Sequence, residues 1–194
     1  MDLIPTTELD AVNIILENDG EAPVAALDDS GFSEAGAAQR VLREISRQVQ
    51  TEGHAFNIDY ERKFTPDVSD EIALPTNTLW VQPTYISQEM SIVERGRKLY
   101  DLEDNSYTFT SPVYLNVCQM LDWTDLPSAA RDYITVRAAR VYQSRSTGST
   151  QQNSFTESDE MRYEATFRRA NNRSRKRGFF RNSSNARLTL RRPL

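Results

Sequence analysis

Apolar residues recur at helical spacing in two stretches near the start of the chain. The first stretch follows Thr7 and Asp10, which have the spacing of a capping box, and it ends at Gly20. The second runs over residues 34–51 and stops at Gly53, and its arginines and glutamines fall largely off the apolar stripe. Both patterns predict amphipathic helices.

The period of the pattern changes to that of β-strands after the second helix. Phe56, Ile58 and Tyr60 alternate with polar residues, and Pro66 and Pro75 interrupt the stretch that follows. Further short runs complete a strand-rich block over residues 54–121; they lie at 79–81, 91–100, 107–109 and 113–117, and the second of them reads as a hairpin around Gly96.

Helical spacing returns after Pro127, and a polar loop at 144–154 precedes a last helix at about 158–170. Beyond Asn171 the composition is that of a basic, disordered segment. The pattern therefore predicts an α+β chain. We expect a four-helix bundle made of residues 1–53 and 122–170, a β-rich insertion at 54–121, and an extended, basic C-terminal arm at 171–194.

Composition and charge add two expectations to this picture. Hydrophobic residues make up 38% of the 194 positions, which is lean for a self-contained globule, so we infer that stability is shared with neighbours in an assembly. Residues 1–160 carry 12 basic and 27 acidic side chains, whereas residues 161–194 carry 11 basic and one acidic. An acidic body with a basic tail indicates that the tail binds a partner.

Several function classes have little support in the sequence. No run is apolar enough for a membrane span or a signal peptide, so we expect no membrane association. Cys118 and His54 are the single cysteine and histidine, which excludes an intrachain disulfide and a cysteine-based zinc site. We expect His54 to pack at a helix–strand junction and Cys118 to be a small buried side chain. No catalytic residue, metal site or cofactor is predicted.

Three clusters of carboxylates are candidates for acid–base chemistry, because paired carboxylates carry out glycoside hydrolysis. They are Asp28 with Asp29, Asp101 with Glu103 and Asp104, and Glu157 with Asp159 and Glu160. The clusters lie in polar loops or at a helix start, where the helix macrodipole alone favours acidic residues. We therefore expect them to be solvated or to stabilise local structure.

The basic tail is the strongest local signal in the chain. Its candidate partner-binding residues combine positive charge with apolar side chains; they are Arg173, Arg175, Lys176, Arg177, Phe179, Phe180, Arg181, Leu188 and Leu190. Such a segment can contact phosphates and stack on bases, dock on an acidic protein surface, or stay solvated. The residues alone leave these three alternatives open.

Three runs of residues resemble the tail tubular protein A family, the head-to-tail adaptors of short-tailed bacteriophages. They are LDAVNIILENDGEAPVAAL at 9–27, RVLREISRQVQTEG at 40–53 followed by Phe56-Asn57, and Leu126-Pro127 with YITVRAARVY at 133–142. The chain departs from the family in two places. His54 stands where the family tends to have an aromatic residue, and the tail is richer in arginine.

The resemblance implies a structural virion protein of the tail, located at the head–tail junction and assembled in the host bacterial cytoplasm. It implies a closed ring, expected as a dodecamer, that joins the portal protein to the tail nozzle protein. Phage DNA would pass through its channel without specific binding, and a tail fibre is a further candidate partner. Two alternatives remain: a tail-associated peptidoglycan hydrolase, and a DNA-binding protein that uses the arginine-rich tail.

Overall fold

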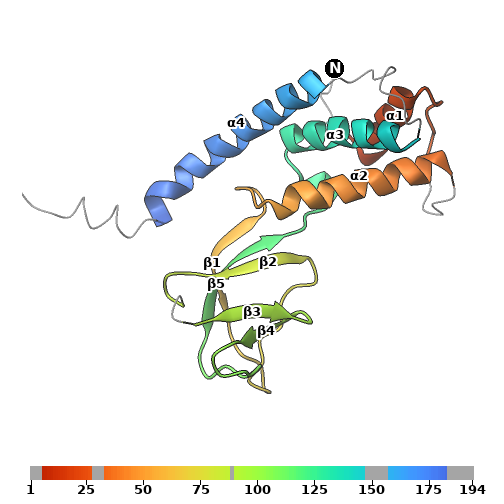
Figure 1. Cartoon of the computed structure of the whole chain (residues 1–194). Coiled ribbons are helices and arrows are strands. Elements are labelled where there is room, and N and C mark those ends of the chain that lie inside the picture. Colours follow the sequence, from red (N-terminus) through yellow and green to blue (C-terminus); the bar gives the residue numbers. More distant parts are fainter. Residues whose placement is uncertain (1–5, 28–32, 88–89, 147–156, 183–194) are drawn as a thin grey trace, which may run out of the picture. The chain divides into compact units, whose positions relative to one another are not determined.

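The computed structural model describes residues 6–27, 33–87, 90–146 and 157–182, with side chains in the last range described up to Ser174 (Figure 1). Helices and antiparallel strands are both present, so the predicted α+β class is confirmed. The chain divides into two compact units. Met1–Gln48 and Asp122–Leu194 form the helical unit, and Val49–Leu121 forms the β unit.

Helix α1, Glu8–Asp19, begins and ends as the sequence predicts. The Asp10 amide donates to Thr7 Oγ1 at 3.1 Å, and the Thr7 amide donates to Asp10 Oδ2 at 2.9 Å, which completes a capping box. Gly20 closes the helix in the left-handed conformation, with φ of +88°. Both signals are local, so they can be read from the sequence without knowledge of the fold.

Helix α3, Ser128–Ser146, contacts both α1 and the last helix, α4, Glu157–Asn182. It follows a short 3₁₀ helix at Trp123–Asp125, and most of its residues from Ala130 to Gln143 are buried. Polar residues join it to α1, because Gln143 Nε2 donates to the Asn18 carbonyl at 3.2 Å. α3 is therefore an inner element of the helical unit.

Helix α2 spans Glu34–Thr51, as predicted, and the last helix, α4, is longer than predicted. We expected α4 to end at Ala170, but it runs over Glu157–Asn182. Residues 171–177 contain neither proline nor glycine, and arginine and lysine are good helix formers, so nothing in this segment stops the helix. The first part of the predicted extended arm is thus helical.

The β unit contains a three-stranded antiparallel sheet in the order β1-β5-β2 (Figure 1). Its strands are Ile58–Phe64, Val113–Gln119 and Thr78–Pro83 respectively. The predicted hairpin around Gly96 is present as β3, Ile92–Arg95, and β4, Lys98–Asp101. Strand β1 starts at Ile58, two residues later than the alternating pattern indicates.

The predicted strand at Tyr107–Phe109 is wrong. This segment makes only a single-residue bridge, between Glu71 and Thr108. The Thr108 amide instead donates to the Ser106 hydroxyl at 3.0 Å, a local bond that competes with strand pairing. Phe109 is nevertheless buried, so its apolar character was a signal of core packing.

The core of the β unit is one apolar cluster drawn from the sheet, the hairpin and the loops. Its buried members are Phe64, Ile72, Leu74, Ile92, Leu99, Phe109, Val113, Leu115 and Val117. Within the described residues, no helix is long and apolar enough to cross a membrane.

Candidate assembly surfaces

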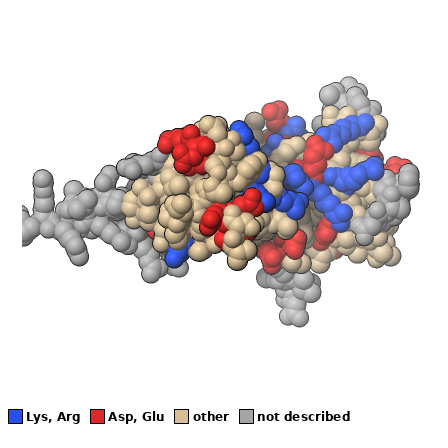
Figure 2. Space-filling view, turned by 90° about the horizontal axis from the view of Figure 1, so that it is seen from below, with Lys and Arg blue, Asp and Glu red and all other residues tan. Residues whose placement is uncertain are grey.

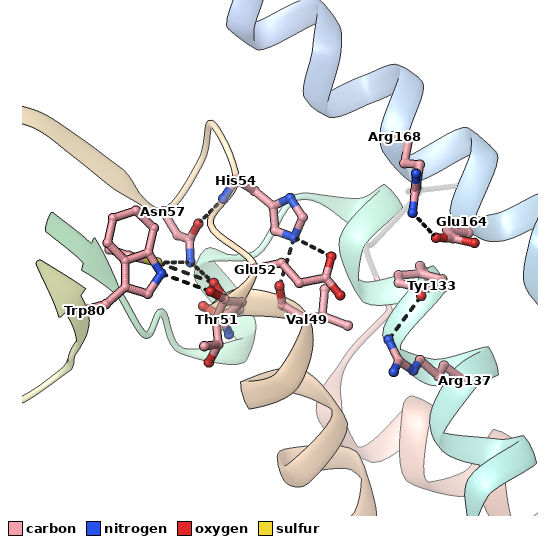
Figure 3. A network of polar contacts seen from close by, with 12 residues as sticks. Val49, Thr51, Glu52, His54, Asn57, Trp80, Tyr133, Arg137, Glu164 and Arg168 are labelled. Atoms are coloured by element: carbon pink, nitrogen blue, oxygen red, sulfur yellow. Dashed lines mark hydrogen bonds and ion pairs between the residues drawn. The ribbon is translucent and has the colours of Figure 1, made fainter. Parts of the chain in front are cut away.

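Helix α4 is attached to α3 by one aromatic stack and a set of ion pairs. The Phe167 and Tyr133 rings stack with centroids 5.5 Å apart, and burial raises the pKa of the Tyr133 hydroxyl. Glu160 forms an ion pair with Arg140, and its carboxylate lies 3.9 Å from Arg137 Nε. Figure 3 shows the Tyr133–Arg137 hydrogen bond in this region. Among the α4 side chains described, Phe167 is the buried one.

The predicted partner-binding residues begin beyond this attachment. Arg173 is exposed on α4. Six further members lie on the helical backbone of α4 without described side chains; they are Arg175, Lys176, Arg177, Phe179, Phe180 and Arg181. Leu188 and Leu190 lie outside the described residues.

A second basic surface lies on the outer face of α2. Arg40, Arg43 and Arg47 are exposed there, at positions i, i+3 and i+7, which share one side of a helix. In Figure 2, Lys and Arg side chains gather in one region of the face shown, the region over α2. The Arg43 guanidinium also lies 3.2 Å from the Glu8 carboxylate of α1. The basic character of this chain is therefore not confined to its tail.

An open groove lies between α2 and α3, with a volume of about 450 Å³. Its lining combines apolar and charged side chains; they include Ala37, Val41, Tyr142, Arg40, Glu44 and Arg145. Arg145 donates from two nitrogens to the two Glu44 oxygens, at 2.7 and 2.9 Å. These hydrogen bonds lower the pKa of the Glu44 carboxyl. Two of the three charged residues named in this lining are arginines.

Sequence reasoning missed this groove because its walls are about one hundred residues apart in the chain. The one sign of this groove in the sequence is the set of arginines on the polar side of α2. A polar helix face is usually solvated, so that signal alone does not indicate a concave site.

His54 and Asn57 form a buried polar junction at the end of α2, within the β unit (Figure 3). The His54 amide donates to Asn57 Oδ1 at 2.8 Å, and the His54 ring nitrogen Nε2 lies 2.8 Å from the Val49 carbonyl. The His54 ring also stacks on Phe56, with centroids 5.5 Å apart. His54 thus packs at a helix–strand junction, as the sequence suggests.

Asn57 is the centre of this junction, and sequence reasoning did not single it out. Its amide nitrogen donates to the carbonyls of Gln50 and Gln119 at 2.8 and 3.1 Å. It also lies 3.3 Å from the sulfur of Cys118, whose pKa burial raises to about 11. A thiol with this pKa stays protonated at neutral pH, so Cys118 is a structural residue rather than a nucleophile.

Two close approaches tighten the same junction. Trp80 Nε1 donates to the Thr51 carbonyl at 2.9 Å, which places the indole against the end of α2. Gly53 has φ of +76°, and a Cβ at this position would lie 2.6 Å from Trp80 Cζ2. Glycine is required here both by the backbone conformation and by the space available.

The carboxylate clusters have local structural roles where the structure describes them. Asp101 Oδ1 accepts the Glu103 and Asp104 amides at 2.8 and 3.4 Å, so Asp101 stabilises a turn. Glu160 pairs with arginines of α3, whereas Asp28–Asp29 lies outside the described residues. No group of three potential metal ligands occurs within the described ranges.

Comparison with known proteins identifies the family of this chain. A family model described as "Tail tubular protein" matches residues 9–177. Tail tubular protein A of Klebsiella phage KP34 is 35% identical to the chain over 136 residues, which cover 70% of this chain and 71% of that protein. These matches confirm the resemblance noted in the sequence. The chain belongs to the tail tubular protein family and is a structural protein of a bacteriophage tail.

Proposed function

We propose that this protein is a ring-forming head-to-tail adaptor. In this role it joins the portal protein to the tail nozzle protein and continues the DNA channel for genome retention and ejection. The ring is expected to be a dodecamer, with a tail fibre as a further candidate partner. Membership of the tail tubular protein family supports a place in the tail, and the lean composition supports a chain that is stabilised by neighbours.

The observation that carries the proposal is the form of α4. The helix is attached to α3 through Phe167 and Glu160, and it continues as a basic helix to Asn182. A polar helical segment of this kind has little stability by itself in water, so it gains stability when it packs on a partner. We propose that residues 171–194 form an arm that docks on the portal protein.

The remaining parts of the chain have corresponding proposed roles. Residues 1–53 and 122–170 form the helical bundle of the ring subunit, and residues 54–121 form the β-rich insertion that faces the outside or the nozzle. The acidic excess of residues 1–160 supports a channel wall that DNA passes without binding, because like charges repel.

Truncation after Ala170 tests the arm directly. This change keeps the Phe167 stack and the Glu160 ion pairs, so we expect the remaining body to stay folded. Its circular dichroism signal, divided by the number of helical residues left, should equal that of the full chain. Binding to purified portal protein should be lost. Truncated protein that binds the portal with unchanged affinity would contradict the role of the arm.

A charge variant separates the effect of the arm's positive charge on portal binding from the effect of its length. Neutralising Arg173, Arg175, Lys176 and Arg177 to glutamine should weaken portal binding and reduce its salt dependence. Neutralising Arg43 and Arg47 of α2, which are exposed and lie outside the arm, is the control and should leave portal affinity unchanged. A steep salt dependence of binding to naked DNA would favour the DNA-binding alternative. Turnover of cell-wall polymer, abolished by one carboxylate variant, would favour the hydrolase.

A further inference from the structure

We propose that the groove between α2 and α3 of one copy receives the loop Asp101–Ser106 of the next copy. The contact would be head-to-tail, because every copy carries one groove and one loop. Such heterologous contacts close into a ring when the rotation between neighbours allows it. The inference rests on the proposed ring function, and it assigns the surfaces that build the ring.

The groove has the features of a receptor for an apolar side chain flanked by acids. Val41 and Tyr142 are buried and form its apolar part, and Arg40 and Arg145 are exposed beside them. Arg145 already donates to Glu44, but a guanidinium carries five N–H donors in a fixed plane, so it can bind a second carboxylate. The volume of about 450 Å³ is enough for a leucine side chain together with part of its neighbours.

The acidic residues close to this region do not line the groove. Asp19, Glu34 and Glu21 contribute to the raised pKa of Tyr142, after burial, so they lie near its hydroxyl. The groove lining itself includes one acid, Glu44, whose charge is balanced by Arg145. Besides the Glu44–Arg145 pair, the groove lining contains a second arginine, Arg40.

The loop after β4 presents the complementary residues. Leu102 is 41% exposed although it is a large apolar side chain, and Glu103 and Asp104 beside it are exposed as well. An exposed leucine next to two carboxylates matches an apolar groove next to two arginines, in both polarity and charge. This charge complementarity favours a second copy of the chain as the occupant.

The loop is also rigid, which lowers the entropic cost of docking. Asp101 is buried and accepts the amides of Glu103 and Asp104 with one oxygen. The Asp101 amide donates to the Ser106 carbonyl at 2.8 Å, so the two ends of the loop are closed. The Leu102 amide donates to the Ser91 carbonyl at 2.8 Å, which fixes the base of the leucine.

Two charge-reversal variants test the contact. The groove variant R40E/R145E and the loop variant E103K/D104K each keep one half of the contact, so each should be monomeric where the wild type forms rings. Their association should weaken roughly a hundredfold or more, since like charges in close contact are strongly unfavourable. An equimolar mixture should recover rings in which the two variants alternate, because the native groove then meets the native loop and the reversed groove meets the reversed loop. Native mass spectrometry measures these species.

Matched controls show whether position or charge is responsible. R43E/R47E on α2 and E61K/E94K on the β strands change charge by the same amount at exposed positions outside the two surfaces, and both should form rings. A37F is a second groove variant that fills the site and leaves the Glu44–Arg145 pair in place. A37F should block ring formation, so the test remains valid even if R40E/R145E misfolds. The fourfold variant R40E/R145E/E103K/D104K reverses both sides and should recover rings.

The outcomes separate this inference from the adaptor function. Rings formed by both the groove variant and the loop variant would overturn the assigned contact, while portal binding through the arm would still stand. A mixture that stays monomeric would equally overturn it, as would a wild-type chain that remains monomeric at every concentration. Loss of portal binding by the Ala170 truncation is independent of all these results.

Discussion

The β unit and helix α4 are held in place in opposite ways. The β unit is built on a continuous apolar cluster and on Asn57, whose side chain joins the end of α2 to strand β5. Helix α4 is held to α3 by the buried ring of Phe167 and by the ion pairs of Glu160. Ion pairs at partly exposed positions contribute little, and Phe167 is the buried side chain among those described on α4.

This difference indicates a division of labour. A unit with a large apolar core and a satisfied polar junction keeps its shape when its surroundings change, which suits a wall or a docking platform. An element with few buried contacts opens at low energetic cost, and elements that bind partners are commonly of this kind. We therefore expect core substitutions to affect folding and α4 substitutions to affect assembly.

The largest effect should come from Leu99→Ala. Leu99 is fully buried in the apolar cluster of the β unit, so the change leaves a cavity and should destabilise the unit by about 3 kcal/mol. Urea denaturation measures this loss. Val68→Ala is the control, because Val68 is fully exposed and its substitution should change stability by less than about 0.5 kcal/mol. Equal effects of the two changes would remove the basis for placing the core at Leu99.

Asn57→Ala should have the next largest effect. It removes the partners of the Gln50 and Gln119 carbonyls and of the His54 amide, which are left without these bonds in a buried site. We expect a loss of about 2 kcal/mol in the free energy of unfolding. Asn77→Ala is the control, because the Asn77 side chain makes an exposed hydrogen bond to the Met120 carbonyl. A smaller loss for Asn57→Ala than for Asn77→Ala would show that the junction is not central.

Local signals in the sequence predicted much of the fold. Thr7, Asp10 and Gly20 act through bonds to their near neighbours, and so they marked the ends of α1 correctly. The hairpin at Gly96 was predictable for the same reason. The predicted end of α4 is wrong because a polar, basic composition fits a helix as well as a disordered segment, and arginine and lysine favour helices.

The candidate sites depend on contacts that no local pattern encodes. Glu44 and Arg145 of the groove are far apart in the sequence. Asn57 and Gln119, which meet in the polar junction, lie near opposite ends of the segment that forms the β unit. Either site could be found only after the strands and helices were placed in space. The family, by contrast, was apparent from runs of residues, and the comparisons confirm it.

Phe167→Ala should have a moderate and local effect. The change removes the ring that stacks on Tyr133, so α4 should open more readily while the rest of the helical unit stays folded. We expect hydrogen exchange of α4 amides to become about tenfold faster, with little change in the β unit. Met161→Ala is the control, because Met161 lies on the same helix and is 58% exposed. Faster exchange throughout the protein would contradict a local attachment.

The smallest effect should come from the capping box of α1, and it depends on pH. Hydrogen bonds from the side chain and the backbone of Thr7 lower the pKa of Asp10 from its ordinary value near 3.8. A carboxyl with a lowered pKa in the folded state stabilises that state above its unfolded pKa, and the contribution is lost as the pH falls through the folded value. Asp10→Ala should therefore cost about 1 kcal/mol at pH 7 and less at pH 3. Glu17→Ala, at an exposed position of the same helix outside the cap, is the control. Denaturant unfolding at the two pH values measures both variants, and an Asp10→Ala effect that does not shrink in acid would mean that the charge of Asp10 has no part in the cap.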